Sequence, residues 1–305
     1  MRRFLTLVSG VAVLGAAGLG AVIAWPVGSA VAPIASAGNV DRGAYLARAS
    51  GCIACHTNFE AGGAPLAGGA PLETPFGTFY PPNLTTDPEH GMGEWTAEQF
   101  AKAVRQGIGP DGTPYYPSFP YTFYADFSDQ DIADLWAAFQ TVQPVDKPAP
   151  ENDVSFPFDQ RWGLKLWRAA FFYDPDTEPV EGRSDSWNRG RELVRGAAHC
   201  GACHTPRNLA GGRDIGASFA GNAQLPGGSK APAIRPKDLA KNDWTVSNLA
   251  YALQTGITPS GDAFGGSMAE VVRDGTRFLT PADREAMALF LLNKDTVEAE
   301  NSASN

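Results

Sequence analysis

Apolar residues recur along the chain at helical intervals, which predicts short helices rather than strands. Two segments show this best, one after Ser128 and one after Thr280, because their apolar side chains return every three or four positions. Those positions are Ile132, Leu135, Trp136 and Phe139 in the first segment and Ala286, Met287, Phe290 and Leu291 in the second. Each segment opens with a hydroxyl N-cap, and Pro281 takes the favoured first helical position. No stretch alternates apolar and polar residues over any length, so an all-α fold is expected.

An internal repeat divides most of the chain into two similar parts. Matching residues are separated by offsets of 147 to 149 positions. The pairs include Arg42 with Arg189, Gly43 with Gly190, His56 with His204, Trp95 with Trp244, and Gly107 with Gly256. An offset that drifts by only one or two residues over this distance indicates a duplicated structural unit.

The repeat and the composition of the flanking segments predict a division into five parts. The expected parts are 1–37, a signal peptide or N-terminal membrane anchor; 38–143, a first domain; 144–185, a linker with an amphipathic helix; 186–297, a second domain; and 298–305, a tail. Two small helical domains of this size would have thin hydrophobic cores unless a large apolar group filled them.

The N-terminal segment has the features of an export signal. Arg2 and Arg3 precede 21 residues without a charge, from Phe4 to Ala24. That length exceeds an ordinary signal core and matches a membrane span, which favours a retained anchor. However, Ala35-Ser36-Ala37 is a sequence that a signal peptidase could cut. In both cases the rest of the chain is expected in the periplasm, with the membrane contact at the N-terminus.

The cysteines provide the strongest chemical signal in the sequence. All four lie in two C-x-x-C-H motifs, Cys52-Ile53-Ala54-Cys55-His56 and Cys200-Gly201-Ala202-Cys203-His204. This spacing is the attachment signature of c-type haem: both thiols reach one porphyrin edge, and the adjacent histidine reaches the iron. A zinc site would need further ligands at suitable spacing, and a redox C-x-x-C needs no histidine. We therefore expect two covalently bound haem c groups, with His56 and His204 as iron ligands.

The charge of the chain excludes one class of partner. Twenty-four basic and 33 acidic residues give a formal net charge of −9. Binding to nucleic-acid phosphates needs clustered positive charge, which the chain lacks, so small molecules or proteins are the expected partners.

The second motif has a clear candidate for the sixth iron ligand. Met268 lies 64 residues after His204 and follows the pair Gly265-Gly266. A thioether ligand stabilises the ferrous state and gives a potential suited to an electron carrier. The alternative is that Met268 is a packing residue. His199, next to Cys200, is expected to be a surface or packing residue because its position directs it away from the iron.

The first motif departs from its own repeat at the matching position. Phe119 stands 149 residues before Met268, and phenylalanine has no lone pair for iron. His90 and Met92 are the nearest substitutes, and Tyr115 and Tyr116 are oxygen candidates. We expect either an open sixth position or one held by His90 or Met92, which leaves this ligand undecided at the level of sequence.

The linker contains a short basic stripe on an otherwise acidic protein. Arg161, Lys165 and Arg168 are spaced so as to share one helical face, with apolar residues on the others. Such a helix could lie at a membrane interface or dock a partner subunit. It could equally be clamped between the two domains, with its basic side chains reaching water.

Several further segments resemble one family in particular. They are Pro82-Asn83-Leu84-Thr85-Thr86-Asp87-Pro88, Gly91-Met92-Gly93-Glu94-Trp95, Tyr116-Pro117-Ser118-Phe119-Pro120-Tyr121, and Phe156-Pro157-Phe158 before Arg161-Trp162. With the two haem motifs they make most of residues 40 to 295 similar to the tandem c-type cytochrome subunits of membrane-bound periplasmic alcohol, aldehyde and gluconate dehydrogenases. Members of that family often carry three haem motifs, and this chain carries two.

This resemblance implies two tandem cytochrome c domains, each wrapped round a covalently attached haem, and a role in electron transfer. A periplasmic dehydrogenase would be the donor, and quinone, a terminal oxidase or another cytochrome would be the acceptor. On this interpretation the chain is a non-catalytic electron-transfer protein, or the cytochrome subunit of a dehydrogenase complex, at the cytoplasmic (inner) membrane. The alternative is a dihaem redox enzyme, peroxidase-like or thiosulfate-oxidising, that uses an open site at the first haem.

Overall fold

The computed structural model describes residues 2–225 and 228–297; within helix α1, of residues 2–13 only the side chain of Phe4 is described. The tail expected at 298–305 lies outside the described residues. The helices are α1 (Arg2–Ala24), α2 (Val40–Ala49), α3 (Cys52–Cys55), α4 (Ala97–Gln106), α5 (Asp129–Phe139), α6 (Gly163–Phe171), α7 (Asp185–Arg195), α8 (Gly201–His204), α9 (Pro236–Ala240), α10 (Val246–Thr255), α11 (Gly266–Asp274) and α12 (Pro281–Leu292). Short 3-10 helices are η1 (Tyr121–Phe123), η2 (Ile215–Ala217) and η4 (Thr276–Phe278).

The fold is mostly helical, but the expectation of a purely helical chain is wrong in one respect. A small antiparallel sheet joins β1 (Leu72–Thr74), β2 (Gly77–Phe79) and β3 (Asp153–Val154) in the order β1-β2-β3. Strands of two or three residues are too short to produce a visible alternation of apolar and polar positions. The third strand comes from the segment expected as a linker, so its pairing was not readable from local sequence.

Two hydrophobic cores organise the molecule. We call residues 40–140 the first half and residues 185–292 the second half. The first core includes Phe100, Ile132, Leu135 and Phe139, and the second includes Leu193, Leu249, Met287 and Leu291. Helix α2 packs on α5 in the first half, and α7 packs on α12 in the second. The apolar positions read from the sequence therefore face these cores.

A glycine allows close helix contact at the same place in each half. A Cβ added to Gly43 of α2 would lie 1.8 Å from the carbonyl oxygen of Asp134 in α5. A Cβ added to Gly190 of α7 would lie 1.8 Å from the carbonyl oxygen of Ala286 in α12. Only glycine permits such contact between the backbones, which explains why the repeat retains it.

The helix starts follow the local sequence. Ser128 accepts a hydrogen bond from the backbone N–H of Asp131, and Thr280 accepts one from that of Asp283. These N-caps confirm the predicted starts of α5 and α12. Helices α4 and α10 also begin alike, with capping boxes at Thr96 and Thr245, respectively.

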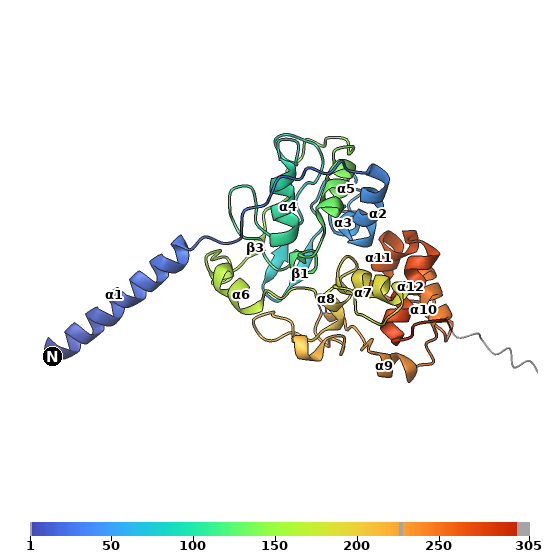
Figure 1. The fold of residues 1–305 in the computed structure, drawn as a ribbon. Helices are drawn as coiled ribbons and strands as arrows, with labels where there is room; N and C mark the ends of the chain where they lie inside the picture. Colours follow the sequence, from blue (N-terminus) through green and yellow to red (C-terminus); the bar gives the residue numbers. More distant parts are fainter. Residues whose placement is uncertain (1, 226–227, 298–305) are drawn as a thin grey trace, which may run out of the picture.

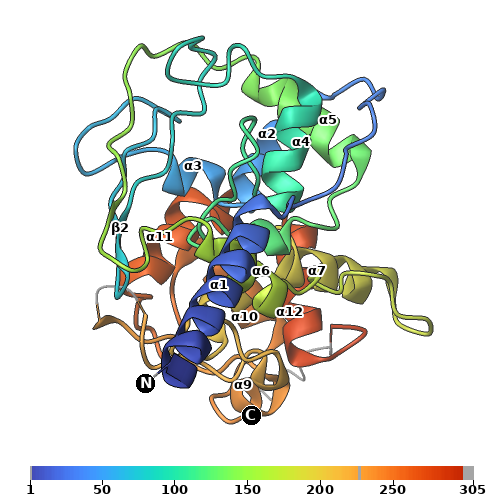
Figure 2. The same ribbon diagram turned by 90° about the vertical axis from the view of Figure 1, so that its left-hand side faces the viewer.

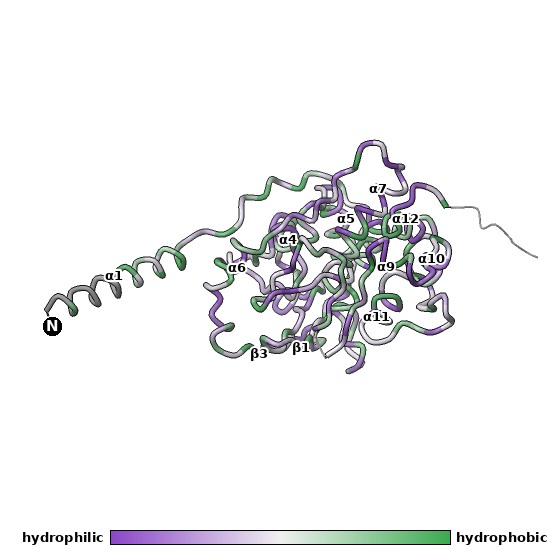
Figure 3. Tube along the Cα trace, turned by 90° about the horizontal axis from the view of Figure 1, so that it is seen from below, coloured by the Kyte–Doolittle hydropathy of each residue, from purple (hydrophilic) through white to green (hydrophobic). Residues whose placement is uncertain are grey.

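Helix α1 projects from the body of the protein (Figures 1 and 2). Figure 3 shows that the described part of α1 is largely apolar and lies apart from the body. The Nζ atom of Lys165 in α6 donates to the carbonyl oxygens of Ile23 (2.5 Å) and Trp25 (2.7 Å), at the C-terminal end of α1. Across the described ranges, the length and apolarity needed for a membrane span are not met together in any helix.

Candidate haem-attachment sites

Helix α3 forms the first C-x-x-C-H turn. Gly51 precedes it with a positive φ of 69°, and the backbone N–H of His56 donates to the carbonyl oxygen of Cys52 (2.9 Å). Cys52 and Cys55 are free thiols at either end of this turn. Burial, followed by the neighbouring Cys55, raises the pKa of Cys52 to about 12. Both sulfurs are therefore held on one turn as thiols rather than as a disulfide.

Helix α8 repeats this arrangement in the second half. Cys200 is its N-cap, and the backbone N–H of His204 donates to the carbonyl oxygen of Cys200 (3.0 Å). Cys200 and Cys203 are also free thiols. Burial raises the pKa of Cys200 to about 12, with Cys203 as the second cause. The sequence motif thus has the same local structure at both positions.

Each motif histidine is oriented by a proline carbonyl. The Nδ1 atom of His56 lies 2.8 Å from the carbonyl oxygen of Pro82, and that of His204 lies 2.7 Å from the carbonyl oxygen of Pro232. A carbonyl oxygen only accepts, so Nδ1 carries the proton and Nε2 keeps its lone pair. Burial lowers the pKa of His56 to about 4 and shifts the pKa of His204 in the same direction. Both rings are therefore neutral and have the tautomer that binds a metal through Nε2.

The loops after the two histidines share a second feature that the sequence analysis missed. Thr57 and Thr205, each 1% exposed, accept a backbone hydrogen bond from Leu66 (3.0 Å) and Phe219 (3.2 Å), respectively. Leu66 and Phe219 both have a φ of 60°. The motif threonine thus closes a loop of different length in each half. The shared signal in the sequence is the threonine directly after each histidine.

The residues present fit a covalently bound haem. Each turn offers two free thiols and a neutral imidazole from one short helix, and this donor set matches the requirements of c-type attachment. Cys55 and Cys203 are the exposed members of their turns, although the adjoining threonines are fully buried. One side of each turn is thus accessible to a bulky group, while the other side packs into the protein.

The two sixth-ligand positions differ in their surroundings. Met268 lies in the first turn of α11, is partly buried and packs against the second core. Phe119 lies in a loop among aromatic rings: its centroid is 5.9 Å from that of Tyr124 and 6.1 Å from that of Tyr115. Met92, 2% exposed, belongs to the first core against which Cys52 packs.

His90 has a polar partner of its own. Its Nε2 atom lies 3.5 Å from Oδ1 of Asp146, and its backbone N–H donates to Oδ1 of Asp87 (2.7 Å). The ring is therefore directed toward a carboxylate at the start of the linker.

The basic stripe of the linker contacts other parts of the chain. Arg161 donates to the carbonyl oxygen of Pro114 (3.3 Å), and the guanidinium of Arg168 lies 4.8 Å from the ring centroid of Tyr121. On another face of α6, Trp167 donates to the carbonyl oxygen of Ala210 (2.7 Å). Helix α6 thus contacts both halves, which supports the clamped arrangement over a free basic face.

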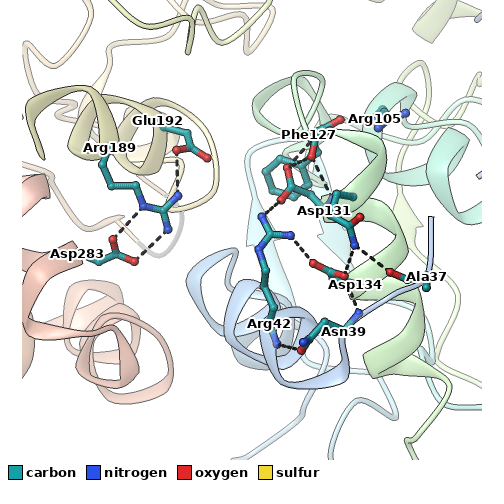
Figure 4. Close-up of polar contacts among 12 residues, drawn as sticks. Ala37, Asn39, Arg42, Arg105, Phe127, Asp131, Asp134, Arg189, Glu192 and Asp283 are labelled. Carbon is teal, nitrogen blue, oxygen red and sulfur yellow. Dashed lines mark hydrogen bonds and ion pairs between the residues drawn. The ribbon is translucent and has the colours of Figure 1, made fainter. Parts of the chain in front are cut away.

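Matching ion pairs support the helix pairs beneath each site (Figure 4). Arg42 of α2 pairs with Asp131 and Asp134 of α5. Arg189 of α7 donates from Nε to Oδ1 of Asp283 in α12 (2.9 Å). Because these arginines directly precede the close-contact glycines, the repeated pair of residues ties the same two helices together in each half.

Comparison with known proteins agrees with this geometry. The family model described as cytochrome c matches residues 40–140. The chain belongs to the c-type cytochromes. It is 41% identical over 308 residues to a protein of Cereibacter sphaeroides named "Diheme cytochrome c-type", and this alignment covers 98% of the chain and 100% of the relative.

Subunits of dehydrogenases are also similar. The chain is 39% identical over 280 residues to the cytochrome c subunit of the quinone alcohol dehydrogenase of Gluconobacter oxydans, covering 88% of the chain and 58% of the subunit. It is 39% identical over 263 residues to the fructose dehydrogenase cytochrome subunit of Gluconobacter japonicus, covering 83% of the chain and 52% of that subunit. The chain thus spans little more than half the length of these two subunits.

Proposed function

We propose that this cytochrome is a dihaem electron carrier that takes electrons from a periplasmic dehydrogenase and delivers them to the respiratory chain. The observation that carries the proposal is the duplicated turn, in which two thiols and an oriented histidine recur with the same hydrogen bonds in both halves. Residues 38–143 and 186–297 would be two tandem cytochrome c domains. The relatives that are dehydrogenase subunits support the choice of donor.

In this proposal, the residues of each half have separate roles. Cys52 and Cys55 hold the first haem and Cys200 and Cys203 the second. A bound haem supplies a one-electron couple between ferric and ferrous iron. His56 and His204 offer Nε2 to the iron, and the carbonyl oxygens of Pro82 and Pro232 fix both rings. These side chains position the ligands and require no proton transfer.

Met268 would complete the second site and exclude water from it. It stands at the start of α11 beside the second core, and its thioether would be the sixth ligand of a haem held by Cys200 and Cys203. A soft sulfur ligand raises the potential of that site. Phe119 cannot act in the same way, which keeps a second candidate function open: a dihaem redox enzyme, peroxidase-like or thiosulfate-oxidising, with an exchangeable position at the first haem.

We also propose a periplasmic location at the cytoplasmic membrane. Residues 1–37 would act as a signal peptide or as the membrane attachment, supported by their basic start and the long uncharged run. The acceptor would be quinone, an oxidase or another cytochrome.

The test is a redox titration of the purified holoprotein followed by optical spectroscopy. We expect two haems per chain by pyridine haemochrome assay, a low-spin second site, and no turnover of peroxide or thiosulfate. A single haem per chain would contradict the dihaem assignment, and rapid turnover would favour the enzyme.

A further inference from the structure

The two C-x-x-C-H turns lie beside each other across a single imidazole ring. His199 directly precedes Cys200, and its ring lies against Gly51, which directly precedes Cys52. A Cβ placed on Gly51 would lie 3.4 Å from Cε1 and 3.9 Å from Nε2 of His199. The residue before one attachment turn therefore touches the residue before the other.

Tyr124 completes this junction from the first half. Its hydroxyl donates to the carbonyl oxygen of Ser50 (2.7 Å) and lies 3.4 Å from Nδ1 of His199. Its ring meets the His199 ring edge-on, with centroids 5.8 Å apart. Tyr124 is only 4% exposed, so these contacts form in the protein interior. One side chain thus joins the backbone before the first turn to the ring before the second.

The backbone of His199 is held in an uncommon conformation. Its φ is +36°, a region that residues other than glycine seldom adopt, and Nδ1 lies 2.9 Å from the carbonyl oxygen of Ala197. Such a conformation persists only where the surroundings determine it. Burial holds the pKa of His199 below its ordinary value, so the ring is neutral and Nδ1 donates to Ala197. The expectation that His199 packs is thus met, and the residue it packs on belongs to the other half.

Further contacts join the two sites at the same junction. Helix α11, which carries Met268, packs against α3. The guanidinium of Arg273 lies 5.8 Å from the ring centroid of Phe59, just after the first motif.

We propose that His199 and Tyr124 are positioning residues that hold the two attachment turns at a fixed separation, so that electrons pass directly between the two haems across this junction. The inference rests on the proposed dihaem function. Haems held by Cys52 and Cys55 and by Cys200 and Cys203 would supply one-electron couples at the two sites, so the exchange would oxidise one site by one electron and reduce the other by one. No bond forms or breaks, and no proton moves.

The direction of transfer follows from the ligands proposed for each site. The first site lacks a counterpart of Met268 and should have the lower potential. Electrons that enter at the first site would therefore move to the second without help from a partner protein.

The test measures electron exchange within the full-length holoprotein. His199→Asn removes the imidazole but keeps a residue type that tolerates positive φ. Tyr124→Phe removes only the hydroxyl. Tyr173→Phe is the matched control, because the Tyr173 hydroxyl also donates to a backbone carbonyl, that of Ala170 (3.3 Å), but lies in the linker rather than at the junction. One site is reduced rapidly by pulse radiolysis, and the approach to internal equilibrium is followed optically.

We expect His199→Asn to slow the exchange at least about tenfold, which corresponds to about 1.4 kcal/mol in the barrier. Tyr124→Phe should slow it by less, and Tyr173→Phe should leave it unchanged. The dipolar broadening between the two ferric sites in electron paramagnetic resonance should fall in the same order. Haem content and far-ultraviolet circular dichroism confirm that each variant is folded and loaded.

Unchanged exchange and unchanged broadening in both junction variants, with two haems bound, would overturn the inference. If His199→Asn does not bind both haems, the rate of electron exchange in Tyr124→Phe becomes the test of the inference, because the phenyl ring of that variant preserves the packing. A wild-type protein that binds fewer than two haems would instead contradict the proposed function, so the two failures are distinguishable.

Discussion

Position 119 is the residue at which the two halves differ most in their chemistry. Phe119 sits among tyrosine rings where the repeat places Met268 in the other half. If Met268 is the sulfur ligand of the second site, this difference of one side chain leaves the first site without that ligand, while His56 keeps its contact with the Pro82 carbonyl. The two sites are therefore expected to have different potentials although their attachment turns match.

Replacing Phe119 with Met should restore the missing ligand. We expect a higher potential for the first haem and loss of carbon monoxide or cyanide binding to the reduced or oxidised protein. Phe119→Leu is the control, because it alters the packing without supplying a donor. Near-infrared magnetic circular dichroism of the wild type is decisive, since a methionine-to-ferric-iron band from both haems would contradict the argument.

The carboxyl group of Asp283 makes the folding stability of the second half depend on pH. Burial opposes its ionisation, but hydrogen bonds from Arg189 and Tyr45 prevail and hold the pKa of its carboxyl below the ordinary range. A group with a lowered pKa stabilises the fold above its ordinary pKa of about 4, and this contribution is lost as the pH falls through the native value.

We therefore expect Asp283→Asn to lower the free energy of unfolding at pH 7 by about 2 kcal/mol. The difference between variant and wild type should shrink below about pH 4. Chemical denaturation at a series of pH values measures both effects. A difference that stays constant down to pH 2 would contradict the assignment to this carboxylate.

At the scale of elements, each half is held by one pair of closely crossing helices. Helix α7 approaches α12 so closely that Gly190 touches a backbone carbonyl, as Gly43 does where α2 crosses α5. Interiors packed this tightly cannot accept even one added methyl group without movement of the backbone. In each half the helix that precedes the attachment turn takes part in this crossing, so the crossing helps to hold the turn in place.

Gly190→Ala should lower the free energy of unfolding by about 2 kcal/mol, because the new methyl group meets the carbonyl oxygen of Ala286. Gly163→Ala in α6 is the matched control, since nothing lies within 4 Å of its added Cβ. That substitution should stabilise the protein by about 0.5 kcal/mol through helix propensity. Equal effects of the two substitutions in thermal unfolding would refute the packing argument.

The elements with strong local signals were predictable from the sequence. The N-caps at Ser128 and Thr280, like the apolar faces of α5 and α12, depend only on residues within one or two helical turns. The spacing of residue types along the chain therefore predicts them. The small sheet was not predictable, because the paired residues of β2 and β3 are 75 and 77 positions apart in the sequence. The spacing of the motif identifies the thiols and the histidines. It does not show that the carbonyl oxygens of Pro82 and Pro232 hold those histidines, because these contacts depend on how the chain folds.

At the scale of the molecule, the two halves share an extensive contact. Helix α2 contributes Ala47 to the first core and Ala49 to the second, and Leu46 and Phe127 pack against both. The hydroxyl of Tyr45 donates to Asp283 (2.6 Å) and accepts from the backbone N–H of Thr280 (3.0 Å). The halves are therefore coupled in stability as well as in position.

Replacing Cys200 or Cys203 with Ala should remove both the second haem and the fold of the second half. The apolar residues that face the porphyrin would lose their main packing partner. Haem staining, helix content and the melting temperature are the measurements. A variant that lacks one haem but keeps its helix content and melting temperature would refute this prediction.

The meeting of the two attachment turns also restricts the order of events during maturation. Before haem is joined, the chain has four free thiols, and the contacts of His199 with Gly51 and Tyr124 place the two attachment turns side by side. In an exported chain, such neighbours would be open to oxidation into a disulfide that links the wrong cysteines. We therefore expect haem attachment to precede the docking of the two halves. On this expectation, the contacts of His199 and Tyr124 across the junction form late in assembly.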